Sequence, residues 1–131
     1  MSKRVLVVDD DPDIITFVVT VLEENGYSPL IANNGEEGMA KAVEERPDLI
    51  ILDVLMPKQS GIKMYREVKG DEPLKGIPVI ILSGIAKRTF LRSQEALTEF
   101  GGQLVPEPEA YLEKPVEPEE LVETIKKLIM E

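Results

Sequence analysis

Three short segments of the chain are apolar throughout, with no polar residue at alternate positions. They run from Val5 to Val8, from Leu49 to Leu52 and from Ile77 to Leu82. A strand with one face in water alternates apolar and polar side chains, whereas a strand covered on both faces reads as a continuous apolar run. We therefore expect these segments to be the central strands of a parallel sheet.

Two weaker segments complete the predicted sheet. Ser28 to Ala32 and Ala110 to Glu113 are short and only partly apolar. Pro29 has no N–H to donate to a neighbouring strand, which suits a position at the edge of the sheet. The sequence therefore predicts three central strands and two edge strands.

Segments with apolar residues at helical spacing separate the predicted strands. Pro12 favours a helix start after the first strand, and Gly26 favours its end. Strand and helix alternate five times, which is typical of an α/β fold with helices on both faces of a parallel sheet. At 131 residues, one domain covering residues 1–131 is expected. The five helices are expected to carry Ile14, Val18, Val21 and Leu22; Met39, Ala42 and Val43; residues 61–69; Phe90, Leu97 and Phe100, ending at Gly101 and Gly102; and Leu121, Ile125, Leu128 and Ile129.

Polar or charged residues follow four of the five predicted strands. In sheets of this kind, ligands bind beyond the carboxyl ends of the strands, where the strand order reverses. The exception is the edge strand that ends at Ala32, after which Asn33 and Asn34 carry no ionisable group. The other four strands lead into Asp9, Asp10 and Asp11; Asp53; Ser83 and Gly84; and Lys114 and Pro115.

The composition excludes several kinds of site. The chain has no Cys and no His, which removes disulfides, thiol catalysis, imidazole acid–base chemistry and the usual zinc ligands. Its 25 acidic and 15 basic residues give a formal net charge of -10, which argues against binding nucleic acid or a membrane surface. No run approaches the length of a membrane span, and the first apolar run is too short for a signal peptide. A cytoplasmic protein is expected.

Carboxylates gathered at one edge of the sheet repel one another unless a cation lies among them. Carboxylate ligands favour a hard ion such as Mg²⁺, which also binds phosphate oxygens. Lys114 would supply a positive charge for an anion, and Ser83 a hydroxyl donor. Each residue alone has an ordinary structural explanation, and Asp11 is expected to cap a helix. Together they predict a site where an aspartate attacks phosphorus and forms an aspartyl phosphate.

The same residues carry a resemblance to the receiver domains of two-component response regulators, in particular the stand-alone chemotaxis and sporulation type. The similarity runs almost end to end and implies a flavodoxin-like, doubly wound (βα)5 fold with strand order 2-1-3-4-5. Whether the chain is complete or part of a longer regulator stays open. The residues concerned are Val5 to Pro12, Leu49 to Asp53 with Met56, Pro57 and Gly61, Val79 to Gly84, and Tyr111 to Pro115.

The resemblance also implies roles for individual residues. Asp53 would accept a phosphoryl group from the phosphohistidine of a histidine kinase or phosphotransfer protein. Asp10, Asp53 and the backbone carbonyl of Leu55 would bind Mg²⁺, with Asp9 acting partly through water. Lys114 would pair with the phosphoryl group, and its bond to Pro115 is expected to be cis.

The predicted output is a switch and not an enzymatic activity on other substrates. Ser83 would turn toward a phosphate oxygen, and Tyr111 would follow into the space that Ser83 leaves. The surface made by the fourth helix, fifth strand and fifth helix would then bind a downstream protein, with no nucleic acid or membrane contact.

Two features depart from the family pattern. The segment Gln103 to Glu109 lengthens the connection before the fifth strand, beyond the common range for a loop. It is expected to lie on the output surface made by the fourth helix, fifth strand and fifth helix, where it would reshape the choice of partner or be a neutral insertion. Leu55 and Ile85 stand two residues beyond Asp53 and Ser83, and neither can orient an attacking water. Slow self-dephosphorylation is therefore expected.

Other functions remain open at this stage. A pseudo-receiver would keep the acidic site but never be phosphorylated. A phosphatase that forms an aspartyl phosphate would use an Asp-x-Asp motif, which Asp9 and Asp11 supply, but 131 residues leave no room for a cap domain. A flavodoxin-like cofactor binder is disfavoured, because the aspartates would repel a nucleotide phosphate.

Overall fold

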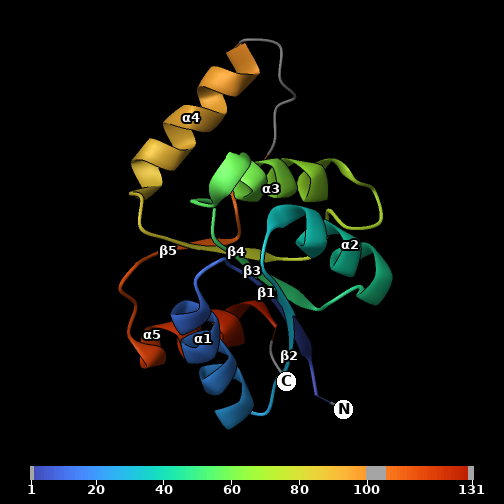
Figure 1. Ribbon diagram of the computed structural model, residues 1–131, viewed down its shortest axis with the longest axis vertical. Helices are drawn as coiled ribbons and strands as arrows, with labels where there is room; N and C mark the ends of the chain where they lie inside the picture. Colours follow the sequence, from blue (N-terminus) through green and yellow to red (C-terminus); the bar gives the residue numbers. More distant parts are fainter. Residues whose placement is uncertain (1, 100–105, 130–131) are drawn as a thin grey trace.

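The computed structural model describes residues 2–99 and 106–129, which form a five-stranded parallel sheet with helices on both faces (Figure 1). The strand order is β2-β1-β3-β4-β5. This confirms the predicted fold class and strand order. In chain order the elements are β1 (Arg4–Val8), α1 (Pro12–Glu24), β2 (Ser28–Ala32), α2 (Gly35–Glu45), β3 (Leu49–Leu52), a short 3-10 helix (Pro57–Gln59), α3 (Ser60–Gly70), β4 (Val79–Ser83), α4 (Lys87–Glu99), β5 (Ala110–Glu113) and α5 (Pro118–Leu128).

The helices divide between the two faces of the sheet as Figure 1 shows, with α1 and α5 on one face and α2, α3 and α4 on the other. The three apolar runs are the central strands, and the residues of β3 and β4 are all buried. Two hydrophobic clusters result, one under α1 and α5 and one under the other three helices. The sheet is therefore covered on both sides, as the apolar runs predicted.

Side-chain caps fix where two of the helices, α1 and α2, begin. Asp11 caps α1 by accepting a hydrogen bond from the Asp13 N–H at 2.9 Å, and Pro12 takes the first helical position. Gly26 follows α1 with φ +83°, a conformation that glycine adopts without strain. Asn34 caps α2 in the same way, through the Glu37 N–H at 2.8 Å. The two caps place the starts of α1 and α2 within four residues of the carboxyl ends of β1 and β2.

The ends of α3 differ from those predicted from the sequence pattern, and the predicted end of α4 lies outside the described residues. The third helix begins at Ser60 and ends at Gly70, one residue longer at each end than the predicted residues 61–69. The fourth helix runs over Lys87–Glu99. Phe100, which was expected to be its last apolar residue, and Gly101 and Gly102, which were expected to end it, lie outside the described residues. Within the described part of the chain, no helix is long and apolar enough to cross a membrane.

Gly61 brings the loop after β3 close to the strand that precedes it. A Cβ atom at this position would collide with the backbone of Asp53 and Val54. Only glycine allows this approach. The close packing ties the first turn of α3 to the end of β3, and so fixes the loop that carries Asp53.

Candidate functional site

Three aspartates meet at the carboxyl ends of β1 and β3, where the strand order reverses. The strands pair in register, with Val8 opposite Leu52, so the residues that follow them lie side by side. Carboxylate oxygens of Asp9, Asp10 and Asp53 all lie within 4.8 Å of one another. Asp9 is 2% exposed and Asp53 4%, whereas Asp10 is exposed. The cluster thus has two buried carboxylates and one that opens to solvent.

Each buried carboxylate holds its own loop through one oxygen. Oδ1 of Asp9 accepts a hydrogen bond from the Asp11 N–H at 3.0 Å. Oδ1 of Asp53 accepts one from the Leu55 N–H at 2.9 Å. The second oxygen of each residue faces Lys114, whose Nζ lies 3.0 Å from Asp9 Oδ2 and 3.3 Å from Asp53 Oδ2.

Lys114 reaches this position from the edge of the sheet. β5 pairs with β4 so that Ser83 lies opposite Glu113, and the Lys114 N–H donates to the Ser83 carbonyl at 2.8 Å. The Lys114–Pro115 peptide bond is cis, as the resemblance implied. The side chain is 20% exposed and extends across the end of β4 to the two buried aspartates.

Burial and charge act in opposite directions on this group of side chains. Burial raises the pKa of Asp9, and the hydrogen bonds from Asp11 and Lys114 only partly offset it. Burial would lower the pKa of Lys114, but the hydrogen bond to Asp9 and the charge of Asp53 raise it overall. One ammonium group thus pairs with two of the three carboxylates of the cluster, and the site retains negative charge that a cation would offset.

Ser83 and Tyr111 lie behind the acidic cluster. Ser83 ends β4 and is fully buried, and its Oγ accepts a weak hydrogen bond from the Ile85 N–H at 3.4 Å. The Tyr111 hydroxyl donates to the Ile85 carbonyl at 2.7 Å. Burial raises the pKa of Tyr111 to about 12, and a hydrogen bond with Ser83 partly offsets this rise. Tyr111 is therefore held next to Ser83.

The structure brings together the residues that the sequence singled out. Asp9, Asp10, Asp53, Ser83 and Lys114 lie at one edge of the sheet, with Tyr111 behind them. Leu55 lies in the adjacent loop and is 55% exposed. Their individual roles stay predictions. Asp11 caps α1 and lies outside the carboxylate cluster, so the geometry does not favour the Asp-x-Asp motif of a phosphatase.

The lengthened connection before β5 is described only from Pro106 onward, because residues 103–105 lie outside the described residues. Glu109 binds the amine of Lys69 on α3 through both of its carboxylate oxygens. Tyr65, also on α3, donates its hydroxyl proton to the Pro106 carbonyl. This part of the connection therefore packs along α3, whereas the sequence led us to expect it on the surface that includes the fourth helix. Within residues 106–109, Glu107 pairs with Lys87 of α4, at 3.9 Å.

Sequence reasoning missed Lys69 and Glu109 as partners. Lys69 stands in α3 beside Val68, on the same buried side as Met64 and Tyr65. A lysine at a buried helix position was the available signal, because such an amine needs a carboxylate partner. Nothing in the local pattern identifies that partner 40 residues away.

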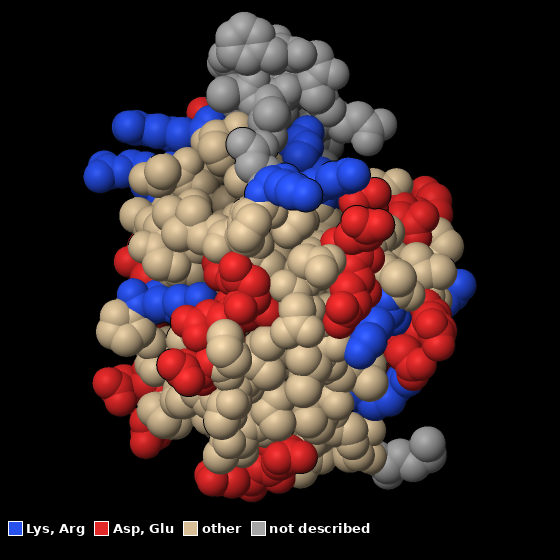
Figure 2. Space-filling view, in the orientation of Figure 1, with Lys and Arg blue, Asp and Glu red and all other residues tan. Residues whose placement is uncertain are grey.

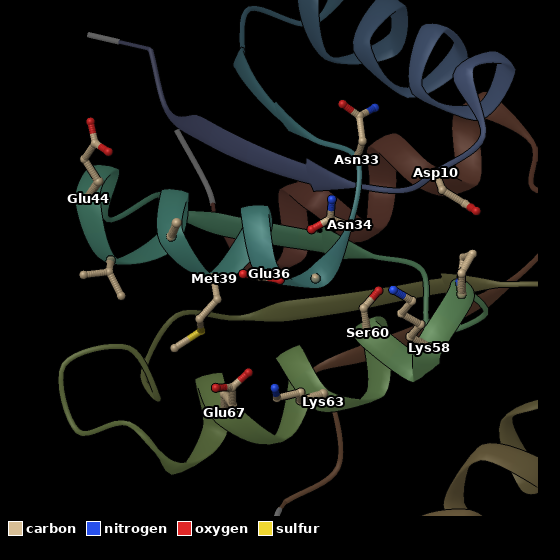
Figure 3. A pocket seen from close by; sticks show the side chains of 14 residues that line it. Asp10, Asn33, Asn34, Glu36, Met39, Glu44, Lys58, Ser60, Lys63 and Glu67 are labelled. Carbon is tan, nitrogen blue, oxygen red and sulfur yellow. The ribbon is translucent and has the colours of Figure 1, made fainter.

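A groove of about 1020 Å³ lies between α2 and α3, next to the acidic cluster (Figure 3). Asp10, Asn33 and Asn34 lie at one end of it, and Glu67 and Lys63 line it from α3. The Ser60 hydroxyl at its wall is buried and has no hydrogen-bond partner within the described residues. No pattern in the sequence predicted this groove.

Comparisons with known proteins agree with this geometry. The family described as the response regulator receiver domain matches residues 5–126. The polar-differentiation response regulator DivK of Brucella anthropi is 33% identical over 126 residues, which cover 96% of this chain and 95% of DivK. The transcriptional regulatory protein PhoP of Bacillus subtilis is 33% identical over 129 residues, which cover 98% of this chain and 49% of PhoP. Among solved structures, the chemotaxis protein CheY4 of Vibrio cholerae has a TM-score of 0.81 at 29% identity and covers 98% of this chain and 100% of its own.

Proposed function

The chain belongs to the receiver-domain family of response regulators, and we propose that it is a switch in which Asp53 accepts a phosphoryl group. Receiver domains are signalling modules of two-component systems and not classical enzymes. We propose that residues 1–131 form one such domain. One observation carries the proposal: Asp53 directly follows a central strand, is 4% exposed, and lies close to two further aspartates and to Lys114.

The carboxylate cluster fits Mg²⁺. Three carboxylate oxygens lie within 4.8 Å of one another, and two of the three side chains are buried with a single lysine to offset them. Oxygen-only ligands of this kind favour a hard cation. Asp10 and Asp53 would bind the ion with the Leu55 carbonyl, and Asp9 would bind it partly through water. When bound, Mg²⁺ neutralises phosphate oxygens and lets an anionic donor approach the site.

The phosphoryl donor would be the phosphohistidine of a histidine kinase or of a phosphotransfer protein. A carboxylate oxygen of Asp53 forms the new O–P bond as the N–P bond of the donor breaks, and the histidine nitrogen keeps the electron pair. Lys114 pairs with the oxygens of the transferred group, since its ammonium already lies 3.3 Å from Asp53 Oδ2. Ser83 donates a hydrogen bond to the same group.

The new group carries about -1.5 to -2 charges and three acceptor oxygens, which is enough to bias a two-state loop. Ser83 and Tyr111 would relay that change to the surface formed by α4, β5 and α5. On this surface α4 exposes Lys87, Arg88 and Arg92 together with Glu95, and α5 exposes acidic residues in its first two turns (Glu119, Glu120 and Glu123) and Lys126 and Lys127 in its last turn. In Figure 2, the basic side chains are most numerous toward the α4 end of the molecule. A downstream protein, and neither nucleic acid nor membrane, would bind here in the cytoplasm.

Phosphorylation of the isolated protein tests the proposal. With a small phosphodonor and Mg²⁺, the intact mass should rise by one phosphoryl group, and Asp53→Ala should abolish the rise. Asp11→Asn is the matched control, since asparagine also caps a helix and the variant should be phosphorylated normally. No mass shift in the wild type would indicate a pseudo-receiver. Turnover of a general phosphoester that is lost in Asp11→Asn would indicate a phosphatase.

A further inference from the structure

Lys69 is a buried amine that fixes the chain just before β5. Its side chain is 1% exposed, and its Nζ lies 2.8 Å and 2.9 Å from the two carboxylate oxygens of Glu109. Glu109 Oε1 also accepts a hydrogen bond from the Val79 N–H at 2.7 Å, at the start of β4. A buried ammonium needs a paired carboxylate, so Glu109 is held against both α3 and β4.

A second contact anchors the same segment three residues earlier. Tyr65 is fully buried in α3, one helical turn before Lys69, and its hydroxyl donates to the Pro106 carbonyl. We call residues 106–109 the strap. Between its two anchors the strap follows α3, and it enters β5 directly after Glu109.

The strap is connected to Tyr111 by a row of three aromatic rings. Tyr65 packs edge-on against Phe90 of α4, with ring centroids 5.6 Å apart. Phe90 in turn packs against Tyr111, again at 5.6 Å, and Phe90 is fully buried. Tyr111 follows Glu109 by two residues in the chain, so the strap reaches it both along β5 and through the rings. At the far end of the row, the Tyr111 hydroxyl binds the Ile85 carbonyl beside Ser83.

We propose that the strap holds Tyr111 beside Ser83 and thereby raises the affinity of the acidic site for a phosphoryl group. Tyr65 and Glu109 are the positioning residues. The inference rests on the proposed phosphoacceptor function. For Tyr111 to leave Ser83, it must break its contact with Phe90, which Tyr65 holds in place, or shift the start of β5, which Glu109 holds. In the structure the Tyr111 hydroxyl already reaches the Ile85 carbonyl beside Ser83, and we take this as the position that the bound phosphoryl group requires. Contacts that hold Tyr111 there therefore favour that group, and the coupling is reciprocal.

Tyr65→Phe is the first test, because it removes only the hydroxyl and leaves the ring against Phe90. Pro106 is exposed, so water can replace the lost donor at its carbonyl. The probe is beryllofluoride with Mg²⁺, a phosphoryl analogue that binds aspartate, and its dissociation constant is measured by ¹⁹F NMR. The constant should rise by roughly threefold to tenfold, the ratio that one net hydrogen bond contributes.

Two further variants examine the other anchor. Lys69→Met with Glu109→Gln removes the ion pair without leaving a buried charge, and it should weaken beryllofluoride binding in the same direction. Glu107→Gln is the matched control within the strap, since its carboxylate is 66% exposed and only pairs with Lys87 at 3.9 Å. This control should bind beryllofluoride as the wild type does.

A double-mutant cycle separates positioning from a general loss of structure. If the strap acts through Tyr111, Tyr65→Phe should have no effect on binding once Tyr111→Ala is present. An equal weakening in both backgrounds, or wild-type affinity in Tyr65→Phe, would overturn the inference while leaving the phosphoacceptor function intact. Wild-type protein that binds no beryllofluoride would overturn both.

Discussion

The ion pair between Lys69 and Glu109 gives a quantitative prediction about folding stability. Glu109→Gln keeps an acceptor for the Val79 N–H but leaves the amine of Lys69, 1% exposed, without its carboxylate. Breaking a buried pair from one side costs about 3–5 kcal/mol. The Glu109 side chain is 36% exposed, so water and the glutamine carbonyl can partly solvate the amine. We expect the free energy of unfolding to fall by about 2 kcal/mol.

The assay is urea and thermal unfolding followed by circular dichroism, and the expected fall in Tm is roughly 6–8 °C for a domain of this size. Adding Lys69→Met should restore most of the loss, because replacing a buried pair with apolar atoms of similar volume is often neutral. Glu72→Gln is the control, since its pair with Lys75 is exposed on both sides and should contribute under about 0.5 kcal/mol. A double variant as unstable as Glu109→Gln alone would refute the reasoning.

Three further predictions concern the site itself. Burial raises the pKa of Tyr111 to about 12, so the folded state keeps a proton that the unfolded state loses near pH 10. The free energy of unfolding should therefore fall between pH 10 and pH 12, by about 2 kcal/mol more in the wild type than in Tyr111→Phe, as measured by urea unfolding. Mg²⁺ should raise the free energy of unfolding by about 2.7 kcal/mol at one hundred times its dissociation constant. Asp10 is the exposed carboxylate of the cluster, and Asp10→Asn should remove most of this gain in a thermal-shift titration. The phosphorylated wild type should lose its phosphoryl group slowly, because the apolar Leu55 and Ile85 cannot orient an attacking water. Leu55→Asn should speed the loss by roughly tenfold, below the range of full general-base catalysis. A half-life of seconds in the wild type, measured by intact mass, would contradict this explanation.

The central strands of the sheet could be predicted from the sequence because a strand buried on both faces is a continuous apolar run. The runs ending at Val8, Leu52 and Leu82 became β1, β3 and β4, and the residues after them form the site. The largest shift is at β4, which begins at Val79 and not at Ile77. The Ile77 N–H donates to the Leu74 carbonyl in the preceding turn, so Ile77 belongs to that turn although it is apolar.

What the sequence could not give are the contacts between distant segments. Lys69 and Glu109 are 40 residues apart, and Tyr65 and Pro106 are 41 apart. Periodicity reports which face of a helix is buried, but it does not report which later segment covers that face. The lengthened connection could therefore be noticed from its length, whereas its attachment to α3 required the structure.

The acidic site is also a local cost to the fold, and this cost follows from its chemistry. Burial raises the pKa of Asp9, which means that the folded state favours the protonated carboxyl. The contribution of this group is therefore most favourable at pH below the unfolded pKa, and it is lost as the pH rises through the folded value. Asp9 and Asp53 both lie buried beside a single lysine, and burying these charged groups lowers the free energy of unfolding. A bound cation reverses the sign of that cost, so the residues that destabilise the fold without a cation are those that give the site affinity for a metal and, through the metal, for a phosphoryl group.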